Sequence, residues 1–108
     1  MRYDSNVRLS NRDLDIIKQA FIKHFQKTDH LWLFGSRVDL NKRGGDIDLY
    51  IETTYNDVPK AVSSKVAFYT EMQYLLGEQR IDIVLNMINS NYVLPIYEVA
   101  KQDGVMLV

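Results

Sequence analysis

Apolar and polar residues of this chain follow two periodicities, one typical of helices and one typical of strands. Three segments have apolar residues at the spacing of an amphipathic helix: residues 11–27, 59–76 and about 92–102. Four shorter segments are apolar throughout or alternate apolar with polar residues: residues 31–34, 46–52, 80–85 and 105–108. Because helices and strands intermingle along the chain, we expect a small mixed β-sheet flanked by helices. This is an α/β (α+β) fold class, in a single domain over residues 1–108.

Residues at the ends of the predicted helices support these boundaries. Ser10 and Asp13 have the spacing of a capping box, in which both side chains bind free N–H groups at the start of the first helix. Pro59 suits the first turn of the second helix, and Gly77 is suited to end it. The periodicity predicts that this second helix buries an apolar face with the following members: Val62, Val66, Tyr69, Met72 and Leu76.

Two aspartates share one face of the predicted strand 46–52. Asp46 and Asp48 are two residues apart, so their side chains leave the strand on the same side. Asp82 lies on the polar face of its own strand, and all three acids converge if the two strands are neighbours. Close carboxylates repel each other unless a cation lies between them, and Mg²⁺ prefers such oxygen ligands; three carboxylates can hold two ions. The alternative is that these acids are only the solvated side of half-buried strands.

A Gly-Ser turn follows the first predicted strand directly. Gly35 lets the backbone approach a ligand closely, and Ser36 adds a hydroxyl donor, so the turn can hold a phosphate. Arg37, Lys42 and Arg43 come next and are candidates for neutralising phosphate charge. Short clusters of loop charges are also often just solvated, and this alternative stays open for Lys42 and Arg43. The turn and the aspartates together predict a site for a nucleoside triphosphate and its metal.

Composition excludes several other classes of protein. The net charge of −1 gives no overall field for binding nucleic acid non-specifically. Without cysteine, the chain has no disulfide, no thiolate nucleophile and no thiolate zinc site. No apolar run approaches the length that spans a membrane, and the N-terminus leads into no apolar signal core. We therefore expect a cytoplasmic protein that does not act at a membrane.

Aromatic and histidine residues fit structural roles better than catalytic ones. His24 and His30 have no second histidine at ligand spacing, and Trp32 is expected in the core. Tyr50 differs from the other tyrosines, because strand alternation puts it on the same face as the aspartates. It is therefore a candidate for lining the nucleotide site, with packing as the alternative.

The turn and the three acids resemble the signature of a known family. They are similar to the motif of the minimal nucleotidyltransferases (MNT), within the DNA polymerase β superfamily: Gly35-Ser36, Asp46-Ile47-Asp48 and Asp82. The resemblance covers roughly residues 12–108. The loop between Ser36 and Asp46 is shorter than in many members. The resemblance implies a polymerase β-like nucleotidyltransferase fold.

The resemblance also implies a role for each residue of the motif. Asp46 and Asp48 would bind two Mg²⁺ ions, and Asp82 would complete the second metal site and assist deprotonation of the acceptor. Gly35 and Ser36 would hold the β- and γ-phosphates of ATP, the substrate. The acceptor hydroxyl would then attack the α-phosphorus in line, and pyrophosphate would leave.

A partner protein is the expected acceptor. Minimal nucleotidyltransferases resembling this chain are often paired with a small helical protein of the HEPN class. In some of these toxin–antitoxin pairs the HEPN protein is a ribonuclease toxin, and the nucleotidyltransferase transfers AMP onto one of its tyrosines. A domain of this length leaves no room for a second domain that presents an acceptor. We therefore expect an ATP-dependent protein adenylyltransferase that performs AMPylation as an antitoxin.

Two alternatives to this function stay open. The first is a stand-alone enzyme that nucleotidylates a small molecule, such as an aminoglycoside, or an RNA end. The second is a binding module that neutralises a toxin by contact and does not catalyse. Self-association into a homo-oligomer is compatible with each of them.

Overall fold

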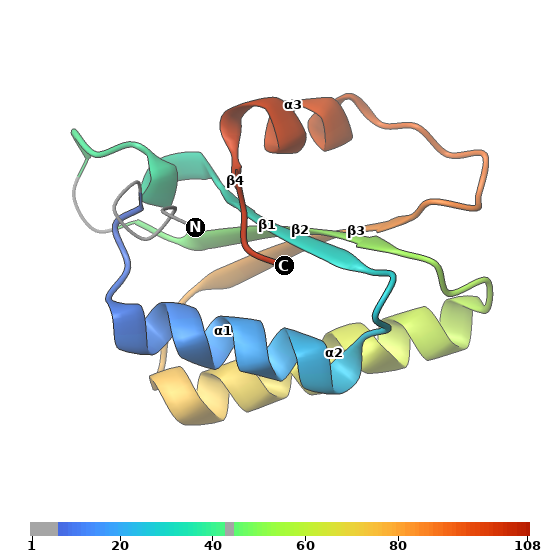
Figure 1. Ribbon diagram of the computed structural model, residues 1–108, viewed down its shortest axis with the longest axis horizontal. Helices are drawn as coiled ribbons and strands as arrows, with labels where there is room; N and C mark the ends of the chain where they lie inside the picture. The colour runs from blue at the N-terminus through green and yellow to red at the C-terminus, as the bar shows by residue number, and fades with distance from the viewer. Residues whose placement is uncertain (1–6, 43–44) are drawn as a thin grey trace.

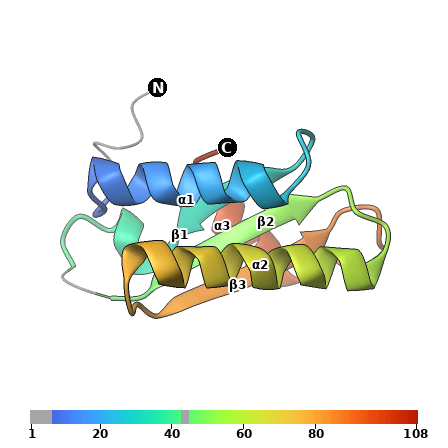
Figure 2. The same ribbon diagram turned by 90° about the horizontal axis from the view of Figure 1, so that it is seen from below.

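The helices of the protein lie on both faces of one β-sheet. The computed structural model describes residues 7–42 and 45–108. In chain order the elements are α1 (Asn11–His24), β1 (His30–Phe34), η2 (Gly35–Val38, one turn of 3₁₀ helix), β2 (Ile47–Thr53), α2 (Val58–Leu76), β3 (Ile81–Met87), α3 (Pro95–Asp103) and β4 (Val105–Met106). α1 and α2 cover one face of the sheet and α3 covers the other, as Figures 1 and 2 show. The predicted α/β fold class is confirmed.

The sheet has four strands in the order β3-β2-β1-β4. β1 pairs antiparallel with β2 and with β4, whereas β2 and β3 are parallel and are connected through α2. The sheet is therefore mixed, as predicted. Parallel pairing matters most for the site, because it brings the first residues of β2 and β3 to the same end of the sheet.

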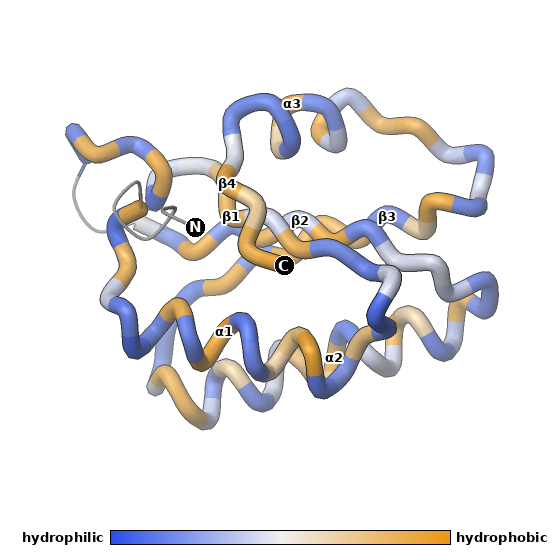
Figure 3. The backbone as a smooth tube through the Cα atoms, in the orientation of Figure 1, coloured by the Kyte–Doolittle hydropathy of each residue, from blue (hydrophilic) through white to orange (hydrophobic). Residues whose placement is uncertain are grey.

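Apolar side chains fill the two sides of the sheet unequally. The larger core lies between the sheet and the pair α1 and α2, and its fully buried centre includes Ile17, Leu31, Leu33, Ile47, Leu49, Ile51, Phe68 and Met72. A smaller cluster on the α3 side consists of Trp32, Tyr50, Tyr97 and Ala100. Figure 3 shows apolar residues gathered in the strands and alternating with polar ones along α1. The smaller cluster covers only part of the α3 face, which leaves room there for polar side chains.

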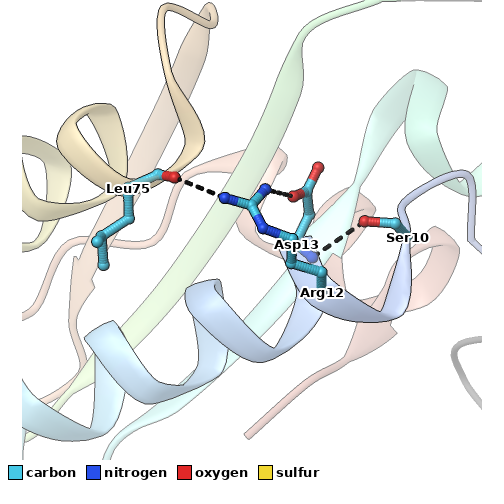
Figure 4. A network of polar contacts seen from close by, with 4 residues as sticks. All are labelled: Ser10, Arg12, Asp13 and Leu75. Atoms are coloured by element: carbon cyan, nitrogen blue, oxygen red, sulfur yellow. Dashed lines mark hydrogen bonds and ion pairs between the residues drawn. The ribbon is translucent and has the colours of Figure 1, made fainter.

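The start of α1 is capped by its serine. Ser10 Oγ accepts a hydrogen bond of 3.1 Å from the Asp13 N–H, which confirms the serine half of the predicted capping box (Figure 4). The Asp13 carboxylate instead accepts a bond of 2.9 Å from Arg12 Nη1. Arg12 Nη2 also donates to the Leu75 carbonyl at 3.2 Å, and this bond ties the start of α1 to the end of α2.

The end of α1 comes at His24, earlier than predicted. Phe25 is extended (φ −120°, ψ 174°), and its ring stacks on Phe21 with centroids 4.8 Å apart. The Gln26 N–H then donates to the Asp29 carboxylate at 3.0 Å, which closes a turn directly after the helix. The apolar spacing that predicted a longer helix therefore reflects packing of Phe25 from outside the helix.

The buried face of α2 differs from the prediction. Val62, Val66 and Tyr69 are 46%, 55% and 40% exposed. The residues of α2 that reach the large core are Phe68, Met72 and Leu76, and Ala61 is also buried. The predicted and the observed apolar faces are neighbours on the helix. The ring of Phe68 makes an edge contact with Phe21, at 5.7 Å between centroids, and this contact turns the observed face toward the core. The predicted face is therefore right only at the C-terminal end of α2.

Asp29 should contribute strongly to the stability of this fold. It is 1% exposed, and its carboxylate accepts hydrogen bonds of 2.8 to 3.0 Å from the Gln26 N–H, the Thr53 hydroxyl, and both the N–H and hydroxyl of Thr54. Asp29→Ala should lower the free energy of unfolding by about 3 kcal/mol, because it leaves several donors without an acceptor. Urea unfolding measures this loss. Asp57→Ala is the control, since the exposed Asp57 makes no side-chain capping bond; equal losses in both variants would contradict the prediction.

Candidate functional site

The three predicted acids lie at the same end of the two parallel strands. Asp48 and Asp82 occupy directly opposite positions in the register of β2 and β3. Asp46 lies just before β2, where the Ile47 N–H donates to the Arg80 carbonyl at 2.9 Å. The neighbouring strands on which the predicted convergence depends are therefore present.

Asp48 and Asp82 lie on the face of the sheet that α3 covers only in part. Their sequence neighbours Ile47 and Ile81 are buried in the large core beneath α1 and α2, so the aspartates leave their strands on the opposite face. On that face the aromatic cluster begins at Tyr50, one alternation further along β2. Asp82 is exposed and Asp48 is half-buried, which leaves the end of the sheet accessible to a ligand.

The carboxyl of Asp48 is disfavoured in its charged form. Burial raises the pKa of the Asp48 carboxyl above its ordinary value of 3.8, and the negative charges of Asp82 and Asp46 raise it further. Arg80 Nε lies 3.5 Å from Asp46 Oδ2, but the two side chains are 77% and 43% exposed, and an ion pair this exposed stabilises little. A cation held between the carboxylates would relieve the repulsion on Asp48.

The Gly-Ser turn lies directly against these acids. Gly35 has a positive φ of +75°, and a Cβ at this position would overlap the Asp48 Oδ2 atom. Ser36 Oγ donates to the Asp46 carbonyl at 3.4 Å. Gly45, with φ +93°, packs against the Ser36 hydroxyl so closely that a side chain there would overlap it. The turn and two of the acids, far apart in sequence, thus form one compact group.

Among the described residues, Arg37 and Lys42 of the predicted basic set form no hydrogen bond or ion pair with the three acids. Arg37 Nη1 donates to the Arg8 carbonyl at 2.8 Å, and its buried Nε has no hydrogen-bond partner within the described part of the chain. Lys42 is exposed, and its N–H donates to the Asp39 carbonyl at 3.2 Å. Arg43 lies outside the described residues. Arg37 is therefore engaged in holding the fold, and Lys42 is the described candidate that remains in solvent.

The donor set of the site suits a hard divalent cation, although its ligands are not closed around one point. Asp48 and Asp82 offer carboxylate oxygens from neighbouring strands, which is the ligand type that Mg²⁺ prefers. Asp46 is turned toward Arg80. Over residues 7–42 and 45–108, no three His, Cys, Asp or Glu side chains are grouped closely enough to hold a metal ion. A metal bound here would therefore draw the Asp46 side chain away from Arg80.

Tyr50 is part of the core and does not line the site. It is fully buried, and its ring packs against Trp32 and Tyr97 with centroids 5.3 and 5.6 Å apart. Its hydroxyl donates to Glu52 at 2.9 Å and accepts from Asn86 at 2.9 Å, and burial raises the pKa of the phenol. The suggestion that Tyr50 lines a nucleotide site is therefore wrong, because α3 supplies Tyr97 as a cover that strand alternation alone does not reveal.

Two arginines near the site do not stand out in the sequence. Arg80 could be found by alternation, because it is two residues before Asp82 and so shares its side of the strand. Arg8 gives no such signal, because its guanidinium bonds reach the carbonyls of Ser36 and Asp39 from a distant part of the chain. Only the folded structure shows that the segment before α1 touches the Gly-Ser turn.

Comparison with known proteins returns no match, either to the model of a protein family or to a curated protein. Among the described residues, no helix is both long and apolar enough to cross a membrane. A functional assignment therefore depends on the geometry of the site and on the chemistry of its residues.

Proposed function

We propose that the protein is a Mg²⁺-dependent nucleotidyltransferase that moves AMP from ATP to an acceptor hydroxyl. The observation that supports this best is the close approach of the Gly35 backbone to the Asp48 carboxylate, with Asp82 directly opposite in the next strand. A metal-bound triphosphate at this point would need both backbone N–H donors and metal-binding oxygens, and the turn and the carboxylates could supply them. The resemblance of the same residues to the minimal nucleotidyltransferases agrees with the proposal.

The residues of the site would divide the work of such a transfer. Asp46 and Asp48 would hold Mg²⁺, which when bound supplies charge neutralisation at the triphosphate. Gly35 and Ser36 would orient the β- and γ-phosphates, and Asp82 would complete the second metal site and assist deprotonation of the acceptor hydroxyl. The hydroxyl oxygen bonds to the α-phosphorus while the bond from that phosphorus to the bridging oxygen breaks, and pyrophosphate leaves. Most of the rate enhancement would come from positioning and charge neutralisation.

The proposed acceptor is a tyrosine of a helical toxin of the HEPN class, and the protein would act as its antitoxin. Two features of the site favour a macromolecular acceptor. Asp82 is exposed, and the ion pair of Asp46 with Arg80 lies in solvent, so the site is open at the end of the sheet. A site that is open in this way admits a side chain carried on another protein. The choice of a HEPN toxin rests on the family resemblance.

Transfer of label from ATP tests this proposal. The purified protein is incubated with Mg²⁺, ATP labelled at the α-phosphate and the product of the adjacent gene. We expect label on a tyrosine of that protein, and a loss of about 10³-fold or more when Asp46→Asn and Asp48→Asn are combined. Asp15→Asn with Asp57→Asn is the matched control, because both acids are exposed and lie outside the site.

Other outcomes of this experiment would identify the alternatives. Label on an added aminoglycoside or RNA end, with none on the helical protein, would replace the proposed acceptor. Toxin neutralisation that survives the double Asp→Asn change in a folded protein would indicate a binding module. Absence of label on every acceptor, with each of the four nucleoside triphosphates, would refute the enzymatic proposal.

A further inference from the structure

Arg8, in the described part of the segment before α1, is bonded to the Gly-Ser turn and to the residues that follow it. Its N–H donates to the Arg37 carbonyl at 2.7 Å, and its own carbonyl accepts from Arg37 Nη1 at 2.8 Å. Its guanidinium donates from Nη2 to the Ser36 carbonyl at 2.8 Å and from Nε to the Asp39 carbonyl at 2.9 Å. Arg8 and Arg37 thus exchange bonds in both directions. We call this set of four bonds the arginine clasp.

The clasp has the chemistry of a rigid support. A guanidinium is planar and presents several donors in fixed directions, so a single side chain can hold two carbonyls at a set separation. The Ser36 carbonyl also accepts a hydrogen bond of 3.1 Å from the Asp39 N–H, within the turn of 3₁₀ helix. This carbonyl therefore accepts two hydrogen bonds, one from the helix and one from Arg8. Val7, next to Arg8, is buried in the large core and anchors the segment from which Arg8 extends. A lysine in place of Arg8 has one nitrogen and cannot reproduce this geometry.

The clasp acts on the backbone directly after the glycine of the site. Gly35 can adopt more backbone conformations than any other residue type, and η2 has no side-chain capping bond at its start. The contact of Gly35 with Asp48 nevertheless requires one conformation, at φ +75°. Bonds to the carbonyls of Ser36 and Asp39 restrict the backbone immediately after Gly35. Arg8 therefore has the means to hold the turn over the carboxylate.

We infer that Arg8 is a positioning residue, which holds the Gly35-Ser36 turn in place for the triphosphate of an incoming nucleotide. The inference rests on the proposed nucleotidyl transfer. Arg8 acts through the turn, since its described bonds go to main-chain carbonyls and not to the acids of the site. Its loss should therefore weaken the binding of the nucleotide and leave the binding of the acceptor protein unchanged.

Arg8→Met and Arg8→Lys test the inference, with Arg12→Met as the matched control. Arg12, at the start of α1, also donates to a main-chain carbonyl, but its bonds go to Asp13 and to Leu75 of α2 and not to the turn. We expect amide hydrogen exchange over residues 35–42 to rise in both Arg8 variants and to stay at the wild-type level in Arg12→Met. This first readout does not depend on activity, and Arg8→Lys serves if Arg8→Met fails to fold.

The second readout is the kinetics of AMP transfer. We expect the KM for ATP to rise about 10- to 100-fold in both Arg8 variants, because residues that hold a binding group in place typically have effects of this size. The KM for the acceptor protein should stay unchanged. Added ethylguanidinium should partly restore the KM of an Arg8→Ala variant, because it can take the place of the missing guanidinium. Wild-type exchange and wild-type KM in a folded Arg8→Met would overturn the role of Arg8 alone. An inactive wild type would overturn the proposed function, and the positioning role together with it.

Discussion

Asp48→Asn should abolish the proposed AMP transfer and at the same time stabilise the fold at neutral pH. The amide keeps the size of the carboxylate but removes the negative charge that lies between Asp82 and Asp46. Transfer should fall by about 10³-fold or more, because a neutral ligand neither holds nor orients Mg²⁺ well. Loss of the repulsion should raise the free energy of unfolding by about 1 kcal/mol, or roughly 4–8 °C in Tm for a domain of this size.

The gain in stability should depend on pH in a definite direction. The pKa of Asp48 is raised in the folded protein above its ordinary value of 3.8, so the folded state binds this proton more tightly than the unfolded state does. The wild-type protein therefore loses stability as the pH rises from 3.8 through the folded pKa of Asp48, and the loss is complete above it. Because Asn does not titrate, the advantage of Asp48→Asn should be full at neutral pH and should shrink as the pH falls toward 3.8.

Thermal unfolding at several pH values, together with the labelled transfer assay, measures both effects. Asp15→Asn is the control, because Asp15 is exposed on α1 and the substitution removes one negative charge outside the site. Added Mg²⁺ should raise the Tm of the wild type and leave that of Asp48→Asn unchanged. A variant that transfers AMP at the wild-type rate, or that unfolds at a lower temperature than the wild type at neutral pH, would contradict the electrostatic account of the site.

The sequence predicts on which face of its strand each acid of the site lies, because strand alternation is a local property. Asp46, Asp48 and Asp82 are each fixed relative to apolar neighbours two residues or fewer away, and those neighbours are buried in the large core. Alternation does not show that β2 and β3 are neighbours. The structure shows this pairing, with Asp48 opposite Asp82. Local periodicity therefore gives the face of each acid, while the pairing of strands needs the whole fold.

Features that depend on contacts between distant elements could not be predicted in this way. Val62 and Val66 have the spacing of a buried stripe, but the packing of Phe68 against Phe21 rotates α2 so that another stripe faces the sheet. Arg37 follows the Gly-Ser turn and so resembles a phosphate ligand, yet its guanidinium binds the carbonyl of Arg8. In both cases several arrangements satisfy the local pattern, and tertiary packing selects one of them.

Gly35→Ala should disable the site and destabilise the protein, because it brings two separate penalties. The first is conformational, since φ is +75° and a residue with a side chain is strained there by about 1–2 kcal/mol. The second is steric, since the new Cβ would overlap the Asp48 Oδ2 atom and must displace either the turn or the carboxylate. A displacement near 1 Å of groups that orient a triphosphate costs about 10²-fold in rate, so transfer should fall at least that far.

Gly77→Ala separates the two penalties, because Gly77 has a similar φ of +85° but no atom within 4 Å of the position of its Cβ. It should lower the free energy of unfolding by the conformational cost alone and leave transfer unchanged. Gly35→Ala should cost more than this, and the excess should disappear when Asp48→Ala removes the overlapping carboxylate. Unfolding in urea of the two single variants, Asp48→Ala and the double variant completes this cycle. Equal costs for Gly35→Ala with and without Asp48 would show that the turn does not lie against the carboxylate, and the geometry proposed for triphosphate binding would then be untenable.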